Sequence, residues 1–125
     1  MGVLLDTHIL YWWLFERRRL SAFAVKTVIQ ADEVYVSAAS LWEMAIKIRL
    51  GKLKGEMEEI TQLLQSTAFQ ELSVSFRHAR RVATLPMHHG DPFDRLLVAQ
   101  AVTEPLHLLT ADTKLKPYSD LVICV

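Results

Sequence analysis

The chain alternates short apolar runs with longer segments of helical periodicity, and this alternation restricts its fold more than any other feature. Strands are predicted at Val3–Leu5, Val34–Val36, Gln70–Val74, Leu106–Thr110 and Leu121–Cys124. Helices are predicted at residues 8–16, 21–31, 38–50, 56–66, 76–85 and 92–103. Strands that alternate with helices are typical of a parallel or mostly parallel sheet with helices on both faces. The sequence holds no repeat, low-complexity tract or linker, so we expect an α/β fold in which residues 1–125 form a single domain.

Composition limits what this domain needs and what it can bind. Of its 125 residues 51% are hydrophobic, which is enough for a core without support from a metal or a disulfide. The single cysteine, Cys124, lies in an apolar run and is predicted to be a buried strand thiol. Lys and Arg number 14, as do Asp and Glu, so the formal net charge is zero. Whole-chain charge therefore gives no sign of nucleic-acid binding, which would need a local patch.

Nothing in the sequence directs the chain to a membrane. Asp6 interrupts the apolar amino-terminal run, and no small-residue cleavage site follows, so the pattern differs from a signal peptide. The longest apolar stretch, Ile9–Phe15, is too short to cross a bilayer. We expect a soluble cytoplasmic protein.

Acidic side chains stand where predicted strands give way to helices. They are Asp6, Glu43, Asp91, Asp94 and Asp112. In a parallel sheet every strand-to-helix junction lies at the same edge, which is the usual place for a ligand. We therefore expect these carboxylates to converge although they are far apart in the sequence.

Three of these acids also have a purely structural interpretation. Asp6 and Asp112 each suit the N-cap of the helix or turn that follows. Glu43 fits a capping box with Ser40 and an ion pair with Lys47 one turn later. Taken one at a time, these roles stay open beside a functional one.

The segment that begins at Asp91 is the most informative of the junctions. Asp91 before Pro92 is a favoured start of a helix, and Asp94 would then occupy a first-turn position that suits the helix dipole. Asp94 also shares its face with the apolar residues three, four and seven positions on. A carboxylate beside an apolar stripe is costly unless something positive meets it. Asp91 is thus explained as a cap, whereas Asp94 calls for a cation.

The acids together predict a metal site. Carboxylates within a few ångströms of each other oppose ionisation unless a cation is present. A set of oxygen ligands without cysteine suits Mg²⁺ or Mn²⁺. Such an ion lowers the pKa of a bound water and neutralises charge on a phosphodiester, so this site favours phosphodiester hydrolysis over acyl or glycosyl chemistry.

Four motifs carry a resemblance to a known family. They are Leu4–Leu10, Ser37–Lys47, Asp91–Ala101 and Leu109–Asp112, which appear in the family's order and span nearly the whole chain. In these motifs the chain resembles PIN domains, and among them the VapC-type toxins of bacterial toxin–antitoxin pairs. The resemblance implies a three-layer α/β/α sandwich and a metal-dependent endoribonuclease that uses Mg²⁺ or Mn²⁺.

The resemblance also implies roles and partners. It places Asp6, Glu43, Asp94 and Asp112 as catalytic and metal-binding acids, with Asp91 as a supporting residue or a further ligand. Thr110 would orient a ligand or a water. The implied partners are RNA, an inhibitory VapB-type antitoxin and a second copy of the chain in a homodimer.

The apolar run Tyr11–Phe15 has two interpretations. It is apolar on all sides, whereas a helix that covers a sheet needs only one apolar face. The run is therefore either deeply buried or part of a protein interface. The partners that the resemblance implies favour the interface.

Several basic and imidazole side chains are candidates for RNA contacts. Lys47 and Arg95 lie within one turn of a metal-site acid, where a cation can hold an RNA phosphate. His8, two residues after Asp6, either touches the site or simply opens a helix. His88 and His89 lack a third nitrogen ligand at a recognisable spacing, so they are interpreted as loop residues that contact RNA. Arg77, Arg80 and Arg81 form a further basic stretch of the kind that usually only solvates a surface.

Two other functions remain open on the residues alone. A receiver-type module would use Asp6 or Asp112 as a phosphoryl acceptor, with Lys114 as a helper, but it gives no reason for Glu43 or for the Asp91 helix start. A metal-dependent DNA nuclease differs only in its substrate.

Overall fold

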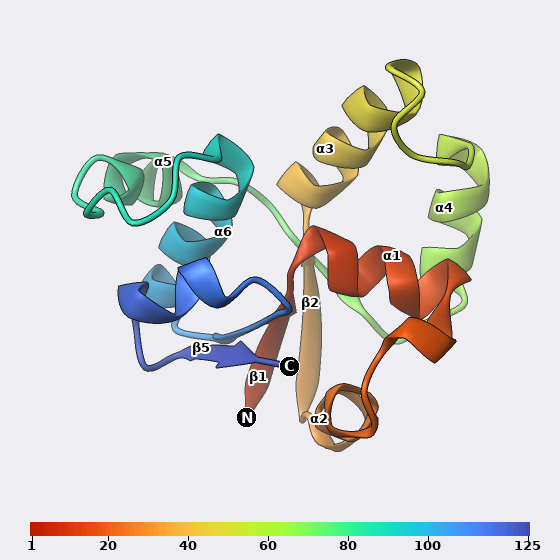
Figure 1. Ribbon diagram of the computed structural model, residues 1–125, viewed down its shortest axis with the longest axis horizontal. Helices are drawn as coiled ribbons and strands as arrows, with labels where there is room; N and C mark the ends of the chain where they lie inside the picture. Colours follow the sequence, from red (N-terminus) through yellow and green to blue (C-terminus); the bar gives the residue numbers. More distant parts are fainter.

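The computed structural model describes residues 1–125 and contains one five-stranded, all-parallel sheet (Figure 1). Its strands are β1 (Gly2–Leu5), β2 (Glu33–Ser37), β3 (Gln70–Leu72), β4 (His107–Thr110) and β5 (Val122–Cys124). Their order across the sheet is β3-β2-β1-β4-β5. This confirms the predicted α/β class, and the sheet is entirely parallel because each strand reaches the next through a crossover segment.

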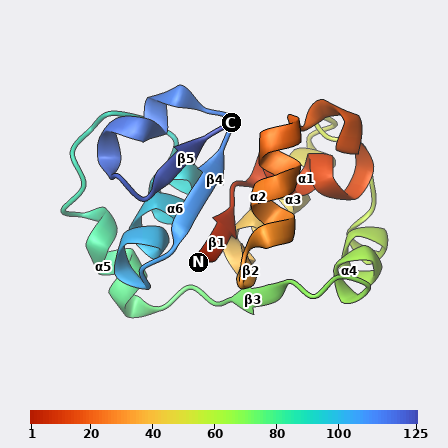
Figure 2. The same ribbon diagram turned by 90° about the horizontal axis from the view of Figure 1, so that it is seen from below.

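Helices cover both faces of the sheet and make three layers. They are α1 (Thr7–Phe15), α2 (Ala22–Gln30), α3 (Ala38–Arg49), α4 (Met57–Gln65), α5 (Phe76–Val82) and α6 (Pro92–Thr103). Two short 3₁₀ helices, η1 (Arg17–Arg19) and η2 (Thr113–Tyr118), complete the chain. Helices α1 to α4 lie on one side of the sheet, and α5, α6 and η2 lie on the other (Figures 1 and 2).

Successive residues of the central strand enter different cores. Val3 and Leu5 of β1 belong to the larger apolar cluster, together with residues of α1, α2, α3 and α4. Leu4, between them, belongs to a second cluster with Leu97 and Val98 of α6. All five side chains are fully buried. This alternation follows from the pleat of a strand that is covered on both faces.

The strand order reverses next to β1, and this creates the place where a ligand is expected. The chain runs outward from β1 through β2 to β3, then crosses back to lay β4 on the other side of β1. Leu5 pairs with Leu109, and the amide of Asp6 donates to the carbonyl of Leu109 at 3.0 Å. The carboxyl ends of β1 and β4 thus lie side by side, at the topological switch point of the sheet.

Most predicted element boundaries hold to within a few residues, with one clear error. The predicted capping box of Ser40 and Glu43 is wrong, because β2 runs directly into α3 and the helix begins earlier than such a box requires. Ser37 is the N-cap, and its side chain accepts from the amide of Ala39. The Ser40 hydroxyl instead accepts from Thr7 Oγ1 at 3.0 Å.

The aromatic run of α1 is half-buried, so it is not the deeply buried helix of one interpretation, and the interface interpretation stays open. Its side chains pack against the larger core and keep partial exposure. Arg17 lies over the ring of Trp13 at 3.6 Å, and Arg19 lies over Trp12 at 5.1 Å, so arginines of η1 cover two of the rings. No helix is long and apolar enough to cross a membrane.

Candidate metal centre

Asp6 follows β1 and lies deepest in the site. Its side chain is buried and caps α1 by accepting from the amide of His8 at 3.0 Å. The hydroxyl of Thr110 donates to its other oxygen at 2.5 Å. Burial raises the pKa of the Asp6 carboxyl, although these two hydrogen bonds act in the opposite direction. Thr110 therefore orients a carboxylate whose charge the surroundings oppose.

Glu43 reaches the site from within α3. Its carboxylate is buried, and Oε2 pairs with the ammonium of Lys47 at 2.8 Å, which confirms the predicted ion pair. Oε1 has no hydrogen-bond partner. A buried carboxylate oxygen without a partner is costly, so this atom is suited to meet a ligand that is positively charged.

Asp91 and Asp94 take different roles at the start of α6. Asp91 is the N-cap, and its Oδ1 accepts from the amides of Phe93 and Asp94 at 2.8 and 3.1 Å. Asp94 points into the site, where burial and then the charges of the other four acids raise its pKa to about 8. The other acids are Asp6, Asp91, Glu43 and Asp112. The predicted N-cap at Asp91 is confirmed.

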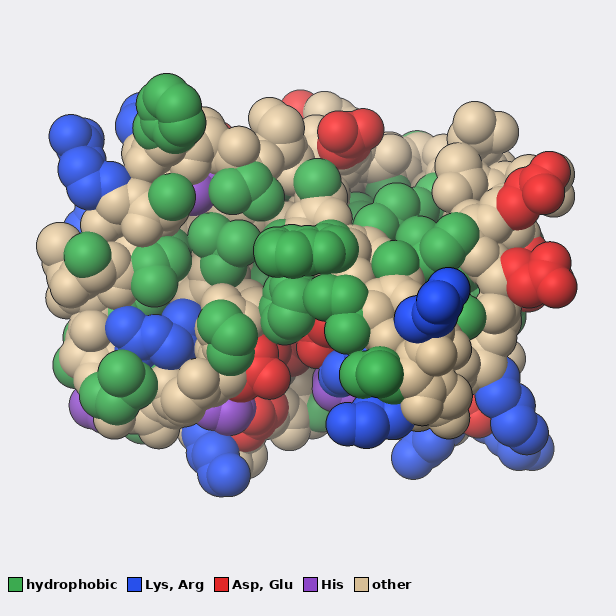
Figure 3. All heavy atoms as spheres, turned by 90° about the horizontal axis from the view of Figure 1, so that it is seen from above, with side chains coloured by type: hydrophobic (Ala, Val, Ile, Leu, Met, Phe, Trp, Pro, Cys, Tyr) green, Lys and Arg blue, Asp and Glu red, His purple; other side chains and the backbone are tan.

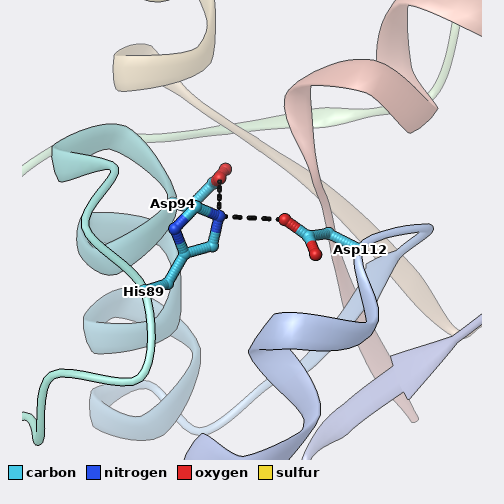
Figure 4. A group of neighbouring side chains, drawn as sticks. All are labelled: His89, Asp94 and Asp112. Carbon is cyan, nitrogen blue, oxygen red and sulfur yellow. Dashed lines mark hydrogen bonds and ion pairs between the residues drawn. The ribbon is translucent and has the colours of Figure 1, made fainter.

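Asp112 and His89 complete the cluster. Nε2 of His89 lies 2.9 Å from Asp112 Oδ2 and 3.2 Å from Asp94 Oδ2, and so joins two acids from different segments (Figure 4). Asp112 follows β4 and caps η2 by accepting from the amide of Lys114. Burial acts to raise the pKa of Asp112, but the hydrogen bonds from Lys114 and His89 outweigh it, and the pKa is lowered.

The hydrogen bonds of His89 define its role. Its Nδ1 accepts from the amide of Asp91 at 3.2 Å, so the ring proton lies on Nε2 and is donated to the two carboxylates. His89 lies in the loop before α6, as predicted, and the structure adds that its ring contacts two acids of the cluster. His89 lies inside the acid cluster and connects the helix start at Asp91 with Asp112.

Sequence reasoning missed His89 because its partners are distant. Asp112 lies 23 residues away in the sequence. The sequence signal that pointed to it is its position, because His89 stands directly before Gly90 and the Asp91 cap and therefore close to the start of α6. His88, by contrast, meets Tyr118 edge to face at the surface, with ring centroids 4.9 Å apart.

The residues present fit a hard divalent cation. Asp94 and Asp112 each offer a carboxylate oxygen, and together with a ring nitrogen of His89 these atoms lie within 4.8 Å of one another. Glu43 contributes a buried oxygen without a partner, and Asp6 a second buried carboxylate. Carboxylate oxygens are the ligands that Mg²⁺ and Mn²⁺ prefer.

Arg95 lies one residue after Asp94 but turns away from the acid cluster. It is buried, and its guanidinium donates to the carbonyls of Pro86, Val82 and Leu85 and to the hydroxyl of Tyr118. All of these acceptors lie outside the acid cluster, so the Arg95 guanidinium holds the end of α5 and the segment after it. His8 stays exposed at the rim, with Nδ1 3.9 Å from Asp6.

Aromatic side chains stand at the mouth of the site. Trp42 is 63% exposed and meets the ring of Phe93 edge to face, with 5.2 Å between centroids. Each precedes an acid of the cluster by one residue, since Glu43 follows Trp42 and Asp94 follows Phe93. Seen from above, acidic side chains lie near the middle of the surface and are bordered by hydrophobic, basic and histidine side chains (Figure 3).

Comparisons with known proteins agree with this geometry. A model of the PIN domain family matches residues 3–121. Ribonuclease VapC22 of Mycobacterium tuberculosis is 32% identical over 118 residues, which are 93% of this chain and 91% of the relative.

Solved structures share the fold at lower identity. VapBC2 of Rickettsia felis, bound to a DNA fragment from its promoter, matches with a TM-score of 0.73 at 16% identity, over 100% of this chain and 98% of that one. FitAcB of Neisseria gonorrhoeae matches with a TM-score of 0.69 at 19% identity, over 98% and 96%. The convergent acids, the strand order and the match along nearly the whole sequence lead to one conclusion: the chain belongs to the PIN domain family, in its VapC group.

Proposed function

We propose that this protein is a divalent-metal-dependent endoribonuclease, the toxin of a toxin–antitoxin pair. The observation that carries the proposal is the group of four carboxylates around Asp94, which together with burial raises its pKa to about 8. Such repulsion at the switch point of a parallel sheet is expected where a cation binds. The relative named ribonuclease VapC22 supports RNA as the substrate.

Asp6, Glu43, Asp94 and Asp112 would hold the ion, which we propose to be Mg²⁺ or Mn²⁺. When bound, such an ion supplies a water of lowered pKa and neutralises charge on the attacked phosphodiester. Thr110 keeps the Asp6 carboxylate in place by its hydrogen bond, and Lys47 does the same for Glu43. His89 fixes Asp112 and Asp94 through the proton on Nε2, and Asp91 fixes the helix that carries Asp94.

The rim of the site suits a single-stranded nucleic acid. The exposed indole of Trp42, which contacts the ring of Phe93, offers a surface on which a base can stack. It lies beside the acids that would hold the metal at the scissile phosphate. Burial acts to lower the pKa of Lys47, but its hydrogen bond to Glu43 and the nearby acidic charges outweigh this, and the pKa is raised. Lys47 therefore stays charged, and together with His8 it is proposed to contact RNA phosphates.

A protein partner forms part of the proposal. The structures that share this fold include VapBC2 of Rickettsia felis and a toxin–antitoxin complex from Klebsiella pneumoniae. We infer that a VapB-type antitoxin inhibits this chain, and that its half-buried aromatic helix α1 belongs to a protein interface. Copurification with the product of the neighbouring reading frame, followed by loss of ribonuclease activity in the complex, tests this.

The receiver-type alternative fits the geometry poorly. An acceptor aspartate must be reached by a phosphodonor, but Asp6 is buried and both its oxygens accept hydrogen bonds. Asp112 is more exposed, but its carboxylate is shared with His89 and the amide of Lys114. Incubation with a small phosphodonor is expected to leave both residues unlabelled.

The decisive experiment compares two variants of the same helix start. Purified protein is incubated with single-stranded RNA or DNA in Mg²⁺, Mn²⁺ or EDTA. We expect RNA cleavage that EDTA and Asp94→Asn abolish and that Asp91→Asn largely retains, because asparagine also caps a helix. Cleavage that survives EDTA or Asp94→Asn contradicts the proposal, and preferential cleavage of DNA replaces its substrate.

A further inference from the structure

A second polar pocket lies at the other end of α6 from the metal centre. It encloses about 320 Å³ and has no hydrophobic residue in its lining. The lining consists of Arg77, Arg80, Arg81, Thr84 and Thr103. At a rise of 1.5 Å per residue, Thr103 lies about 14 Å beyond Asp94 along the helix axis. The pocket is therefore separate from the acid cluster.

The spacing of the arginines explains why they share one pocket. Residues three and four positions apart lie on one face of a helix, and Arg77, Arg80 and Arg81 have this spacing, while Thr84 follows in the turn that ends α5. Helix α5 packs against α6, which brings Thr103 to the same face. Arg77, Arg80 and Arg81 thus form a basic stripe on α5, and the end of α6 closes one side of the pocket.

No acid of the protein neutralises this stripe. None of the three guanidiniums forms an ion pair with a carboxylate, whereas Arg19 pairs with Glu16 elsewhere on the surface. Glu104, next to Thr103, is engaged with Nε2 of His78 at 2.5 Å. Three like charges that line one pocket repel one another unless an anion lies between them.

Helix electrostatics accounts for only part of the arrangement. Arg80 and Arg81 occupy the last turn of α5, where positive charge is favourable. Arg77 stands in the first turn, where positive charge is unfavourable. Its presence in the stripe therefore needs another reason.

The two threonines add hydroxyl groups to the arginine face. Thr84 Oγ1 donates to the carbonyl of Arg81 at 2.8 Å and keeps its lone pairs. Thr103 Oγ1 is buried without a hydrogen-bond partner. Because Thr103 lines the pocket, an oxygen ligand bound there would offer this buried hydroxyl a partner.

We propose that this pocket binds a phosphate of the RNA backbone at a distance from the bond that is cut. The inference rests on the proposed ribonuclease function, because a strand that enters the metal centre brings further phosphates. Each guanidinium can donate two parallel hydrogen bonds to one phosphate group, and a lining without hydrophobic residues offers no surface for an apolar peptide side chain. The pocket thus increases affinity for RNA without reading its sequence.

The test uses two triple variants that remove the same charge. The pocket variant is Arg77→Gln/Arg80→Gln/Arg81→Gln, and the matched control is Arg17→Gln/Arg18→Gln/Arg19→Gln in η1. All six side chains are exposed, so both proteins are expected to fold, which circular dichroism checks. Binding of a fluorescent single-stranded RNA long enough to span both sites is measured by anisotropy in EDTA, where nothing is cut.

We expect the affinity of the pocket variant for RNA to fall about tenfold, or about 1.4 kcal/mol. The slope of log affinity against log salt is expected to decrease by about 0.7 for each phosphate that the variant no longer binds. The control keeps both the affinity and the slope. Cleavage of a dinucleotide, which reaches only the metal centre, is expected to be the same in both variants.

Three results overturn the inference. Equal reductions of affinity in the two variants mean a general effect of charge. If the pocket variant binds RNA as tightly as the wild type but no longer binds inorganic phosphate, the pocket is a site for a free anion. If it binds RNA as tightly but binds the antitoxin more weakly, the pocket is a site for an acidic segment of the antitoxin. Because the binding assay needs no cleavage, a reduction confined to the pocket variant supports the site even if the chain proves not to cut RNA.

Discussion

At the scale of single residues, the unfavourable electrostatics of the site is clearest at Asp94. Its carboxyl is drawn toward the neutral form by burial and by four neighbouring carboxylates. Two neighbouring side chains offset part of this negative charge. His89 donates a hydrogen bond to the cluster through Nε2–H, and the ammonium of Lys47 pairs with the carboxylate of Glu43. Removal of the Asp94 charge is therefore expected to stabilise the metal-free protein, whereas removal of one partner of an ordinary buried ion pair destabilises a protein.

Asp94→Asn is expected to stabilise the metal-free protein, increasingly as the pH rises. The pKa of Asp94 is about 8 in the folded chain against an ordinary value of 3.8, so between these pH values the folded state holds a proton that the unfolded state has lost. Stability of the wild type therefore falls as pH rises through this window and levels off above it, by an amount on the order of a few kcal/mol. Urea unfolding in EDTA at pH 5, 7 and 9 measures the difference between the two proteins. A variant that is less stable at pH 9 would show that Asp94 is mainly a structural residue.

Arg95 carries a second residue-scale prediction. Its buried guanidinium donates to three backbone carbonyls and a tyrosine hydroxyl, which would lose their partner together in Arg95→Gln. We expect the free energy of unfolding to fall by about 2–4 kcal/mol. Chemical denaturation measures it, and RNA affinity of the folded variant should be unchanged. A stable variant with weaker RNA binding would restore Arg95 as a residue that binds RNA.

At the scale of elements, α3 and α6 each present an acid and an aromatic ring side by side. Trp42 and Phe93 meet beside the acids because their helices begin at the same edge of the sheet. One helix thus supplies both a ligand oxygen and part of a stacking surface.

Trp42→Ala is expected to weaken RNA binding by about 1–3 kcal/mol, the contribution of one stacked base. Trp42→Phe should retain most of the affinity, because it keeps an aromatic face. Ile29→Ala, at a side chain of similar exposure in α2, serves as the control. Fluorescence anisotropy in EDTA measures the RNA affinity of all three variants. If Trp42→Ala binds RNA as tightly as the wild type, Trp42 is not a stacking surface for RNA.

The same elements show what the sequence could predict. The strands, the helix start at Asp91 and Pro92, and the acids at the junctions depend on neighbouring residues or on the regular geometry of a parallel sheet, so their positions followed from the pattern. His89 and Arg95 did not follow. Their partners, Asp112 and the carbonyls after α5, are set by how a loop packs on a helix, which leaves no periodic signal in the sequence.

At the scale of the whole molecule, a bound cation should couple the site to global stability. Its proposed ligands come from segments on both faces of the sheet, so the ion would bind only the folded chain. We expect Mg²⁺ or Mn²⁺ to add about 2.7 kcal/mol at a concentration roughly 100 times the dissociation constant. Thermal melting with and without EDTA measures the shift, which should be much smaller in Asp94→Asn; equal melting temperatures in all conditions would argue against a metal centre here.

The placement of β4 beside β1 has a consequence for a chain under synthesis. Asp6 is made early, but Asp112 comes late, and the strand that precedes it must slot in next to the first strand before the acids can meet. No amino-terminal portion that lacks β4 contains a complete set of ligands. The proposed metal site, and with it any ribonuclease activity, is therefore expected to form only after nearly the entire protein has been translated.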